Sequence, residues 1–215
     1  TGTLNTRYGN INVQSKLVGR FHIENLSAAI AVALSFGLSI DQIEKALPYC
    51  EGVKGRIEKV KSNSNRAVYV DYAHTPDAIA KTLRTLREIM SRDQKLWIVF
   101  GCGGDRDKTK RPLMASEAQK YSDNIVITSD NPRSENPDTI LLDIETGFHK
   151  NNLISGQIIK KIADRKSAIE YALTHMGSND VCLIAGKGHE DYQIVGSSKL
   201  KFDDVQVSQE ILKTL

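Results

Sequence analysis

The sequence predicts an α/β protein: a Rossmann-like domain with a mostly parallel sheet, preceded by the carboxyl-terminal remnant of another domain. Beyond residue 66, short apolar segments alternate with helical segments of about 10 to 15 residues, which is typical of βαβ units around a parallel sheet. The residues before that offer only a hairpin and two helices, too few to enclose a core. The length, 215 residues, suits one domain plus part of a second.

The remnant comes first. Its expected elements are a hairpin at residues 1–12 that turns at Gly9 and Asn10, and helices at residues 25–37 and 39–47. Ser39 and Gln42 have the spacing of a capping box at the start of the second helix. A charged, glycine-containing break follows at residues 51–55. We place the boundary there, which gives domains of residues 1–55 and 56–215.

Five strands are expected in the second domain, at residues 67–70, 95–100, 124–128, 157–162 and 181–185. Helices are expected to follow, one from the Thr75 cap through Pro76 to Met90, one opened by Pro112, two at residues 138–147 and 167–176, and one capped by Asp204. In the first of these helices the spacing of Ile79, Leu83, Leu86, Ile89 and Met90 predicts a buried face.

Composition narrows the class of protein. Lysine and arginine number 29 against 26 acidic residues, and the net charge of +3 is too small to indicate nucleic-acid binding by bulk charge. No apolar run could span a bilayer and no signal peptide is recognisable. Cys50, Cys102 and Cys182 lie far apart, which supports neither a disulfide framework nor a zinc finger. We therefore expect a soluble, cytoplasmic protein that binds neither nucleic acid nor membrane. We also expect it to be a monomer.

Polar clusters follow all five expected strands, at residues 71–74, 101–111, 129–133, 164–165 and 186–190. Parallel strands bring such loops to one edge of the sheet, where ligands bind. The Asn131-Pro132 turn fixes the direction of Arg133, and a fixed guanidinium suits a carboxylate or phosphate. With Arg106 beside it and Glu190 opposite, the pocket would match a zwitterionic amino acid. Ordinary solvated turns are the alternative for any single cluster.

Two nucleotide motifs fail in the glycine-rich segment at residues 101–108. The dinucleotide fingerprint needs glycine where Arg106 stands, and no complete P-loop occurs in the sequence. What remains is a turn whose backbone can approach an anionic ligand closely, or else a flexible basic loop. A metal site or acid-base pair made by Asp71, His74, His189 and Glu190 is disfavoured, because the spacing is wrong and no third ligand is identifiable.

Four motifs together carry a resemblance to a known family. They are VDYAHTPDA at residues 70–78, VFGCGGDRDKTKRPLM at 99–114, TSDNPRSENP at 128–137 and AGKGHEDYQ at 185–193. In this order they resemble the carboxyl-terminal half of the Mur ligases, cytoplasmic enzymes of peptidoglycan synthesis. The resemblance covers nearly the whole chain. It implies that residues 1–55 end a central ATP-binding domain and that residues 56–215 are the complete Rossmann-like, amino-acid-binding domain.

The resemblance also implies an activity. Mur ligases phosphorylate a substrate carboxylate with ATP, and the amine of an incoming amino acid attacks the acyl phosphate to form an amide. The motifs are most similar to those of members that add meso-diaminopimelate to UDP-MurNAc-L-Ala-D-Glu. The implied substrate contacts are Arg106, Asp130, Asn131, Pro132, Arg133, Gly186 and Glu190, and the implied ATP contacts are Asn25, Arg56, Asp71 and His74. The P-loop and the ligands of Mg2+ are expected upstream, so we expect no catalytic or metal-binding residue here and no activity from this chain alone.

Physical chemistry favours diaminopimelate over lysine. The two differ by one distal carboxylate, and lysine would leave the guanidinium of Arg133 unpaired at a cost of roughly 1 to 3 kcal/mol. Relatives that add lysine generally lack this arginine. Two alternatives stay open: a ligase of the same family that adds lysine or another amino acid, and a non-catalytic module that binds an anion or amino acid.

Overall fold

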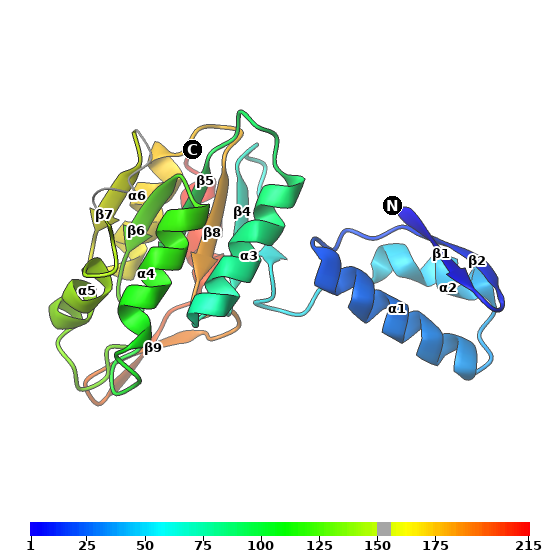
Figure 1. Ribbon diagram of the computed structural model, residues 1–215, viewed down its shortest axis with the longest axis horizontal. Coiled ribbons are helices and arrows are strands. Elements are labelled where there is room, and N and C mark those ends of the chain that lie inside the picture. The colour runs from blue at the N-terminus through cyan, green and yellow to red at the C-terminus, as the bar shows by residue number, and fades with distance from the viewer. Residues whose placement is uncertain (150–155) are drawn as a thin grey trace. The chain divides into compact units, whose positions relative to one another are not determined.

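The computed structural model describes residues 1–149 and 156–215, and these form two compact units, Thr1–Val53 and Lys54–Leu215 (Figure 1). The division lies two residues before the predicted boundary. The assignment of the first unit to a central ATP-binding domain stays a prediction. Among the described residues, no helix combines the length and apolar character needed to cross a membrane.

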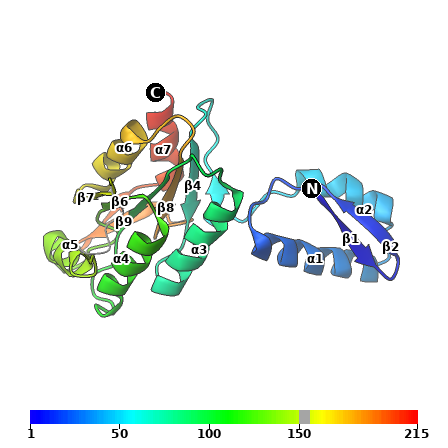
Figure 2. The same ribbon diagram turned by 45° about the horizontal axis from the view of Figure 1, so that its top comes forward.

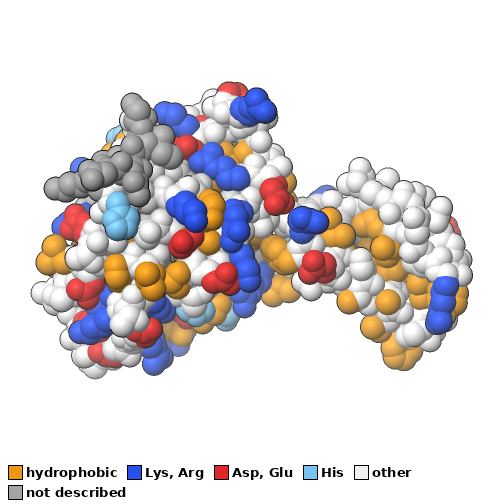
Figure 3. Space-filling view, in the orientation of Figure 1, with side chains coloured by type: hydrophobic (Ala, Val, Ile, Leu, Met, Phe, Trp, Pro, Cys, Tyr) orange, Lys and Arg blue, Asp and Glu red, His pale blue; other side chains and the backbone are white. Residues whose placement is uncertain are grey.

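The first unit is a hairpin packed with two helices. It contains β1 (Gly2–Thr6), β2 (Gly9–Val13), α1 (Arg20–Ser35), α2 (Ile40–Ala46) and the short 3-10 helix η1 (Leu47–Tyr49). Its buried core consists of Ile11, Ile30, Ile43 and Leu47. Apolar side chains are also exposed on its surface, as the orange atoms in Figure 3 show.

Two expectations for the first unit are wrong in detail. The hairpin turns at Arg7 and Tyr8, because Thr6 pairs with Gly9, which places Gly9 and Asn10 inside the second strand. The helix α1 begins at Arg20 rather than at residue 25, since the amide of His22 already donates to the carbonyl of Gly19 at 3.0 Å. The capping box of Ser39 and Gln42 is confirmed at α2.

The second unit is built on a six-stranded sheet in the order β3-β4-β8-β5-β6-β7. Only β3 (Glu58–Lys59), at one edge, is antiparallel to its neighbour. The other strands run parallel: β4 (Ala67–Asp71), β5 (Leu96–Phe100), β6 (Asn124–Ile127), β7 (Ile158–Lys161) and β8 (Val181–Ala185). The predicted mostly parallel α/β fold is therefore confirmed. The strand β3 and a later hairpin were not predicted.

Helices cover both faces of this sheet. One layer contains α3 (Pro76–Ile89), α4 (Lys110–Tyr121) and α5 (Pro137–Glu145), and the other contains α6 (Arg165–His175) and α7 (Asp204–Leu212) (Figure 2). Every residue of β5 and β8 is buried, as expected for continuous apolar strands enclosed from both sides. Cys102 and Cys182 are buried in this unit, whereas Cys50 is exposed.

Side chains fix where most of these helices begin. Thr75 caps α3 as predicted, and Asp164 caps α6. The predicted Asp204 cap is wrong: the carboxylate of Asp203 accepts the amides of Val205 and Gln206, and Asp204 is a buried helical residue. The predicted core position at Ile89 is also wrong, because this last residue of α3 is 51% exposed.

Candidate amino-acid-binding site

Four of the predicted polar clusters lie at the same end of the sheet, because each follows the carboxyl end of one of the parallel strands β4, β5, β6 and β8. The strand order matters for their arrangement. Although β8 comes last in the chain, it lies between β4 and β5. The loop at residues 186–190 is thereby inserted between the loops at residues 71–74 and 101–111 (Figure 1).

The turn that follows β6 holds Arg133 in an unusual backbone conformation. Its φ angle is 51°, in the left-handed region, which costs a non-glycine residue about 1 to 2 kcal/mol. The backbone is fixed on both sides, since the amide of Arg133 donates to the carbonyl of Ile194 at 3.1 Å and its carbonyl accepts from Gly196 at 2.8 Å. Its Nη1 donates to the carbonyl of Gly104 at 2.8 Å. The direction of this half-buried side chain is therefore set by the fold.

The glycine-rich loop after β5 packs directly on this turn. The amide of Gly104 donates to the carbonyl of Asn131 at 2.9 Å, and a Cβ at position 104 would lie 1.9 Å from the carbonyl oxygen of Pro132. Only glycine permits this approach. A Cβ at Gly103 would meet Nη1 of Arg133 at 2.9 Å and Cγ of Arg106 at 3.6 Å. The two arginine side chains thus flank the same glycine, and Arg106 is exposed.

A network of charged groups braces these two loops. The carboxylate of Asp105 accepts from the amide and hydroxyl of Ser134 at 3.2 and 2.6 Å, and its own amide donates to Glu135 at 2.6 Å. The buried guanidinium of Arg111 pairs with Glu135 at 2.8 Å and with Asp143 at 2.7 Å. Hydrogen bonds from Arg111, and then from the amide of Asp105, lower the pKa of Glu135 to about 2. The loops that carry the two arginines therefore form one rigid assembly.

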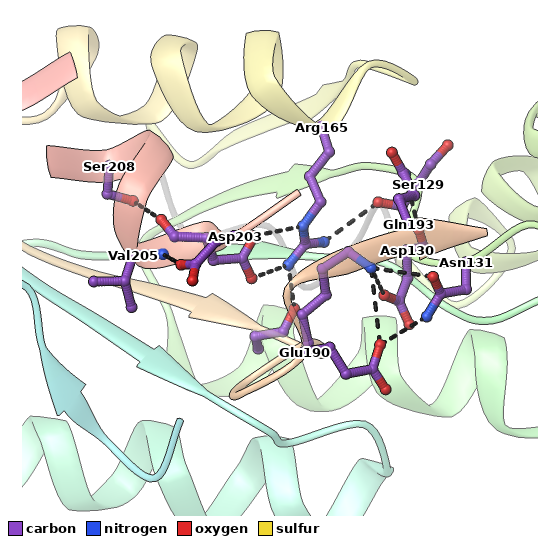
Figure 4. A network of polar contacts seen from close by, with 12 residues as sticks. Ser129, Asp130, Asn131, Arg165, Glu190, Gln193, Asp203, Val205 and Ser208 are labelled. Atoms are coloured by element: carbon purple, nitrogen blue, oxygen red, sulfur yellow. Dashed lines mark hydrogen bonds and ion pairs between the residues drawn. The ribbon is translucent and has the colours of Figure 1, made fainter. Parts of the chain in front are cut away.

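The loop after β8 supplies the acidic side of the site. One oxygen of Glu190 accepts a hydrogen bond from Nδ2 of Asn131 at 2.9 Å, and the Glu190 side chain is 18% exposed. A Cβ at Gly186, whose φ is 115°, would lie 3.8 Å from Cγ of Asp130. Figure 4 shows the side chains of Asp130, Asn131 and Glu190 gathered around one point. The structure thus brings together the residues predicted to bind substrate.

A hairpin that was not predicted makes hydrogen bonds to the turn that carries Asp130 and Asn131. It consists of β9 (Tyr192–Val195) and β10 (Ser198–Lys201). Nε2 of Gln193 donates to the carbonyl of Asp130 at 2.8 Å, and the amide of Ile194 donates to Oδ1 of Asn131 at 2.9 Å. The sequence carried a signal for it, since a glycine-serine pair lies between two short segments of alternating character at residues 192–201.

The cluster at residues 164–165 does not contribute side chains to the exposed site. Asp164 caps α6, and the guanidinium of Arg165 is fully buried. It pairs with Asp204 through Nε at 2.8 Å and Nη2 at 2.7 Å. It also donates to the carbonyls of Ser129 and Ala185, at 3.3 and 3.1 Å, where β6 and β8 end. The expectation of a polar ligand-binding cluster here is corrected, because the charge of Arg165 is used inside the protein.

Asp71, predicted to contact ATP, is engaged by protein groups. Its side chain is buried, and its oxygens accept from the amides of Ile57 and Ala73, both at 2.8 Å, and from the hydroxyl of Thr82 at 3.4 Å. Burial raises the pKa of this carboxyl, although the hydrogen bonds oppose the shift. Asp71 therefore fixes the start of the second unit, next to Arg56.

Arg56 and His74 both contact the ring of Tyr72. The guanidinium carbon of the exposed Arg56 is 5.3 Å from the ring centroid of Tyr72. The ring of His74 meets the same tyrosine edge-on at 4.6 Å, and its Nδ1 is 2.7 Å from the Tyr72 carbonyl. Asn25 is exposed on α1 of the first unit.

Backbone contacts join this cluster to the acidic loop. A Cβ at Gly55, whose φ is 70°, would lie 2.2 Å from the amide nitrogen of His189. The carbonyl of Gly55 accepts from the amide of Tyr72 at 2.9 Å. The start of the second unit therefore packs directly on the loop that carries Glu190.

The site offers charges of both signs to a ligand. Arg106 makes no hydrogen bond or ion pair with any described residue, so its guanidinium is available, and Glu190 has one oxygen that accepts no hydrogen bond from that part of the chain. Such a site can bind a carboxylate and an ammonium group at once. Within residues 1–149 and 156–215, no group of three His, Cys, Asp or Glu side chains could hold a metal ion.

Comparisons with known proteins identify the family of this chain. The family model described as Mur ligase, glutamate ligase domain, matches residues 55–188. UDP-N-acetylmuramoyl-L-alanyl-D-glutamate--2,6-diaminopimelate ligase of Geobacillus kaustophilus is 46% identical over 97% of this chain and 41% of its own length. The ligase of the same name from Rickettsia rickettsii is 43% identical over 98% of this chain and 42% of its own length. The chain thus spans about two fifths of these relatives.

Solved structures give the same result. A structure of UDP-N-acetylmuramoyl-L-alanyl-D-glutamate--2,6-diaminopimelate ligase matches with a TM-score of 0.75 at 38% identity, covering 99% of this chain and 42% of the other. Folylpolyglutamate synthase of Mycobacterium tuberculosis, solved with ADP, matches with a TM-score of 0.64 at 21% identity over 86% of this chain and 41% of the other, which shows a shared fold. From its motifs, its fold and these matches, the chain belongs to the Mur ligase family.

Proposed function

We propose that this chain is the carboxyl-terminal part of an ATP-dependent amide ligase that adds meso-diaminopimelate to UDP-MurNAc-L-Ala-D-Glu in the cytoplasm, as a monomer. Its second unit binds the incoming amino acid. The observation that carries the proposal is the pairing of Arg106 and Arg133 around Gly103, with Glu190 attached to the same turn through Asn131. The relatives named for this reaction, at 43% and 46% identity, support it.

In the proposed complex, the residues divide the amino acid between them. Arg106 and Arg133 bind carboxylate groups, and Glu190 binds an ammonium group. The remaining amine attacks the acyl phosphate, formed from the dipeptide carboxylate by phosphoryl transfer from ATP. A proton leaves the nitrogen, an amide bond forms, and phosphate departs. The role of the second unit is to hold the amine in a fixed place, which lowers the entropic part of the barrier.

The nucleotide would contact the edge of this unit. Arg56 offers a cation and Tyr72 and His74 offer ring faces, all within one small cluster. The buried carboxylate of Asp71 acts through the backbone, because it holds the amide of Ile57 and with it the position of Arg56. No step is assigned to a metal here; we expect the ligands of Mg2+ upstream of this chain.

Selectivity is the sharpest consequence. Diaminopimelate carries a distal carboxylate that lysine lacks, and leaving the half-buried guanidinium of Arg133 without a carboxylate partner would cost about 1 to 3 kcal/mol. We expect the chain to bind meso-diaminopimelate at least about tenfold more tightly than lysine or glutamate. Calorimetric titration of the 215-residue chain with each of the three amino acids measures this. Equal affinities would favour a ligase for another amino acid, and no binding by any of them would contradict the proposal.

Variants locate the preference. Arg133→Ala should remove the discrimination between diaminopimelate and lysine, and Arg133→Gly should do the same without the strain of a left-handed alanine. The matched control is Arg92→Ala, which removes an exposed arginine from the loop before β5, at the opposite edge of the sheet. If the Arg133 variants keep the wild-type selectivity, this residue does not read the distal carboxylate.

A further inference from the structure

Lys187 is a fully buried cation close to the residues predicted to bind substrate. Its side chain has no solvent exposure, and its Nζ lies 2.7 Å from the carbonyl oxygen of Tyr192 and 3.2 Å from Oδ1 of Asn131. The carboxylate of Asp130 is 3.2 Å away and that of Glu190 is 3.9 Å away. Lys187 therefore touches three of the residues predicted to bind substrate, without facing solvent itself.

Burying an ammonium group is costly, so its presence calls for a role. Desolvation costs several kcal/mol per ion, and an apolar side chain of similar size often serves packing better. Burial lowers the pKa of Lys187, and the neighbouring Asp130 carboxylate opposes this shift. A buried lysine is thus less favourable for packing than an apolar side chain would be. Its contacts with Asp130, Asn131 and Glu190 point to a role in the site.

The hydrogen bonds show how Lys187 orients Asn131. Oδ1 of Asn131 accepts from both Nζ of Lys187 and the amide of Ile194, at 3.2 and 2.9 Å. With its oxygen held in this way, the amide must direct Nδ2 to the other side, where it donates to Oε2 of Glu190 at 2.9 Å. The other oxygen of Glu190 accepts no hydrogen bond within the described chain. The orientation set by Lys187 is thus transmitted to the exposed oxygen.

The balance of charge around Lys187 favours an ammonium group as the part of the ligand that binds here. Three carboxylates and two cations make up the cluster: Asp130, Glu190 and Asp204 with Lys187 and Arg165. Arg165 is paired with Asp204 at both of its oxygens, so within the described part of the chain Lys187 is the cation that faces the other two carboxylates. One negative charge is left over, and an ammonium group of the ligand would neutralise it.

We propose that Lys187 is a positioning residue, which orients Asn131 and Glu190 so that Glu190 presents its free oxygen to an ammonium group of the incoming amino acid. This inference rests on the proposed function. It predicts a division between ligand groups: Lys187 supports recognition of the amine, whereas the braced loops of Arg106 and Arg133 recognise the carboxylates independently of it.

The test compares two ligands that differ only in their amines. Meso-diaminopimelate and pimelate have the same chain and the same carboxylates. In Lys187→Met, we expect the dissociation constant for meso-diaminopimelate to rise at least about tenfold and that for pimelate to change by less than about threefold. A general loss of structure would weaken both ligands alike. Lys166→Met, at an exposed position on α6, is the matched control and should change neither.

A double variant keeps the test decisive if Lys187→Met alone destabilises the fold. Lys187→Met leaves the Asp130 carboxylate buried without a partner, so Lys187→Met with Asp130→Asn removes both charges, and it is compared with Asp130→Asn alone. The added Lys187→Met should still weaken diaminopimelate at least about tenfold and spare pimelate. Equal binding of diaminopimelate by both, or equal loss for both ligands, overturns the inference. Failure of the wild-type chain to bind diaminopimelate would instead refute the proposed function.

Discussion

The two units of this chain differ in how fully they bury their apolar surface. The second unit encloses every residue of β5 and β8 between two helical layers. The first unit has a core of four buried apolar residues, while Phe36 and Tyr49 are 81% and 84% exposed. Other large apolar side chains of the first unit are also exposed, namely Tyr8, Ile23, Val32, Leu38 and Val53. Only the second unit has the complete interior that a stable domain needs.

The second unit also buries more ionisable side chains than the first unit. Among the described residues of the second unit, three cationic side chains have no exposure: Arg111, Arg165 and Lys187, each paired with carboxylates. Among the described residues of the first unit, one ionisable side chain is buried, that of His22. A charge inside a protein persists only where surrounding groups are held in place. We infer that the geometry of the candidate site depends on the fully buried core of the second unit.

The largest expected effect comes from separating the units. Residues 54–215 alone should unfold in one cooperative transition with a stability of about 5 to 15 kcal/mol, whereas residues 1–53 alone should show no cooperative transition. Circular dichroism during urea titration of each piece measures the difference. A cooperative transition in residues 1–53 would break the comparison.

The next effect concerns the deepest ion pair of the second unit. Arg165→Met leaves Asp204 buried and unpaired, and should lower the free energy of unfolding by about 3 to 5 kcal/mol. Adding Asp204→Leu removes the stranded carboxylate and should recover most of that loss. The denaturation midpoints of the single and double variants measure this. If both variants are equally unstable, the loss comes from the hydrogen bonds to Ser129 and Ala185 and not from the unpaired charge.

The smallest effect is a pH dependence of the second unit. Because the pKa of Glu135 is lowered from 4.5 to about 2, its ionised form contributes stability that is present above pH 4.5 and is lost as the pH falls toward 2. The pKa of Asp71 is raised, which acts in the opposite sense, so the wild type must be compared with Glu135→Gln. The urea midpoint of the wild type should fall more steeply between pH 4.5 and 2 than that of the variant; parallel slopes would show that Glu135 contributes nothing.

Local patterns explain what the sequence could predict. The buried strands appear as continuous apolar runs, and the caps at Ser39 and Thr75 depend on neighbours within a few residues. The polar turn before Arg133 is local too. The end of the sheet at which the clusters lie follows from parallel topology alone, which is why the sequence predicts that Arg106, Arg133 and Glu190 lie together.

Long-range pairing explains the rest. Nothing near Arg165 in the sequence shows that its guanidinium lies inside the protein, because its partner, Asp204, is 39 residues away. The sequence does not indicate the position of Lys187 for the same reason, since Asn131 lies 56 residues from it. The left-handed backbone of Arg133 was also missed, because that conformation is imposed by Ile194 and Gly196 and is rare for arginine.

The contact between Gly55 and the loop at residues 186–190 has a practical consequence for protein engineering. A fusion that joins the first unit of another protein to this second unit would naturally be made near the boundary. A junction that placed any side chain at position 55 would push against His189 and displace the neighbouring Glu190. Chimaeras should therefore exchange residues only up to Val53 and keep the native sequence from Lys54 onward.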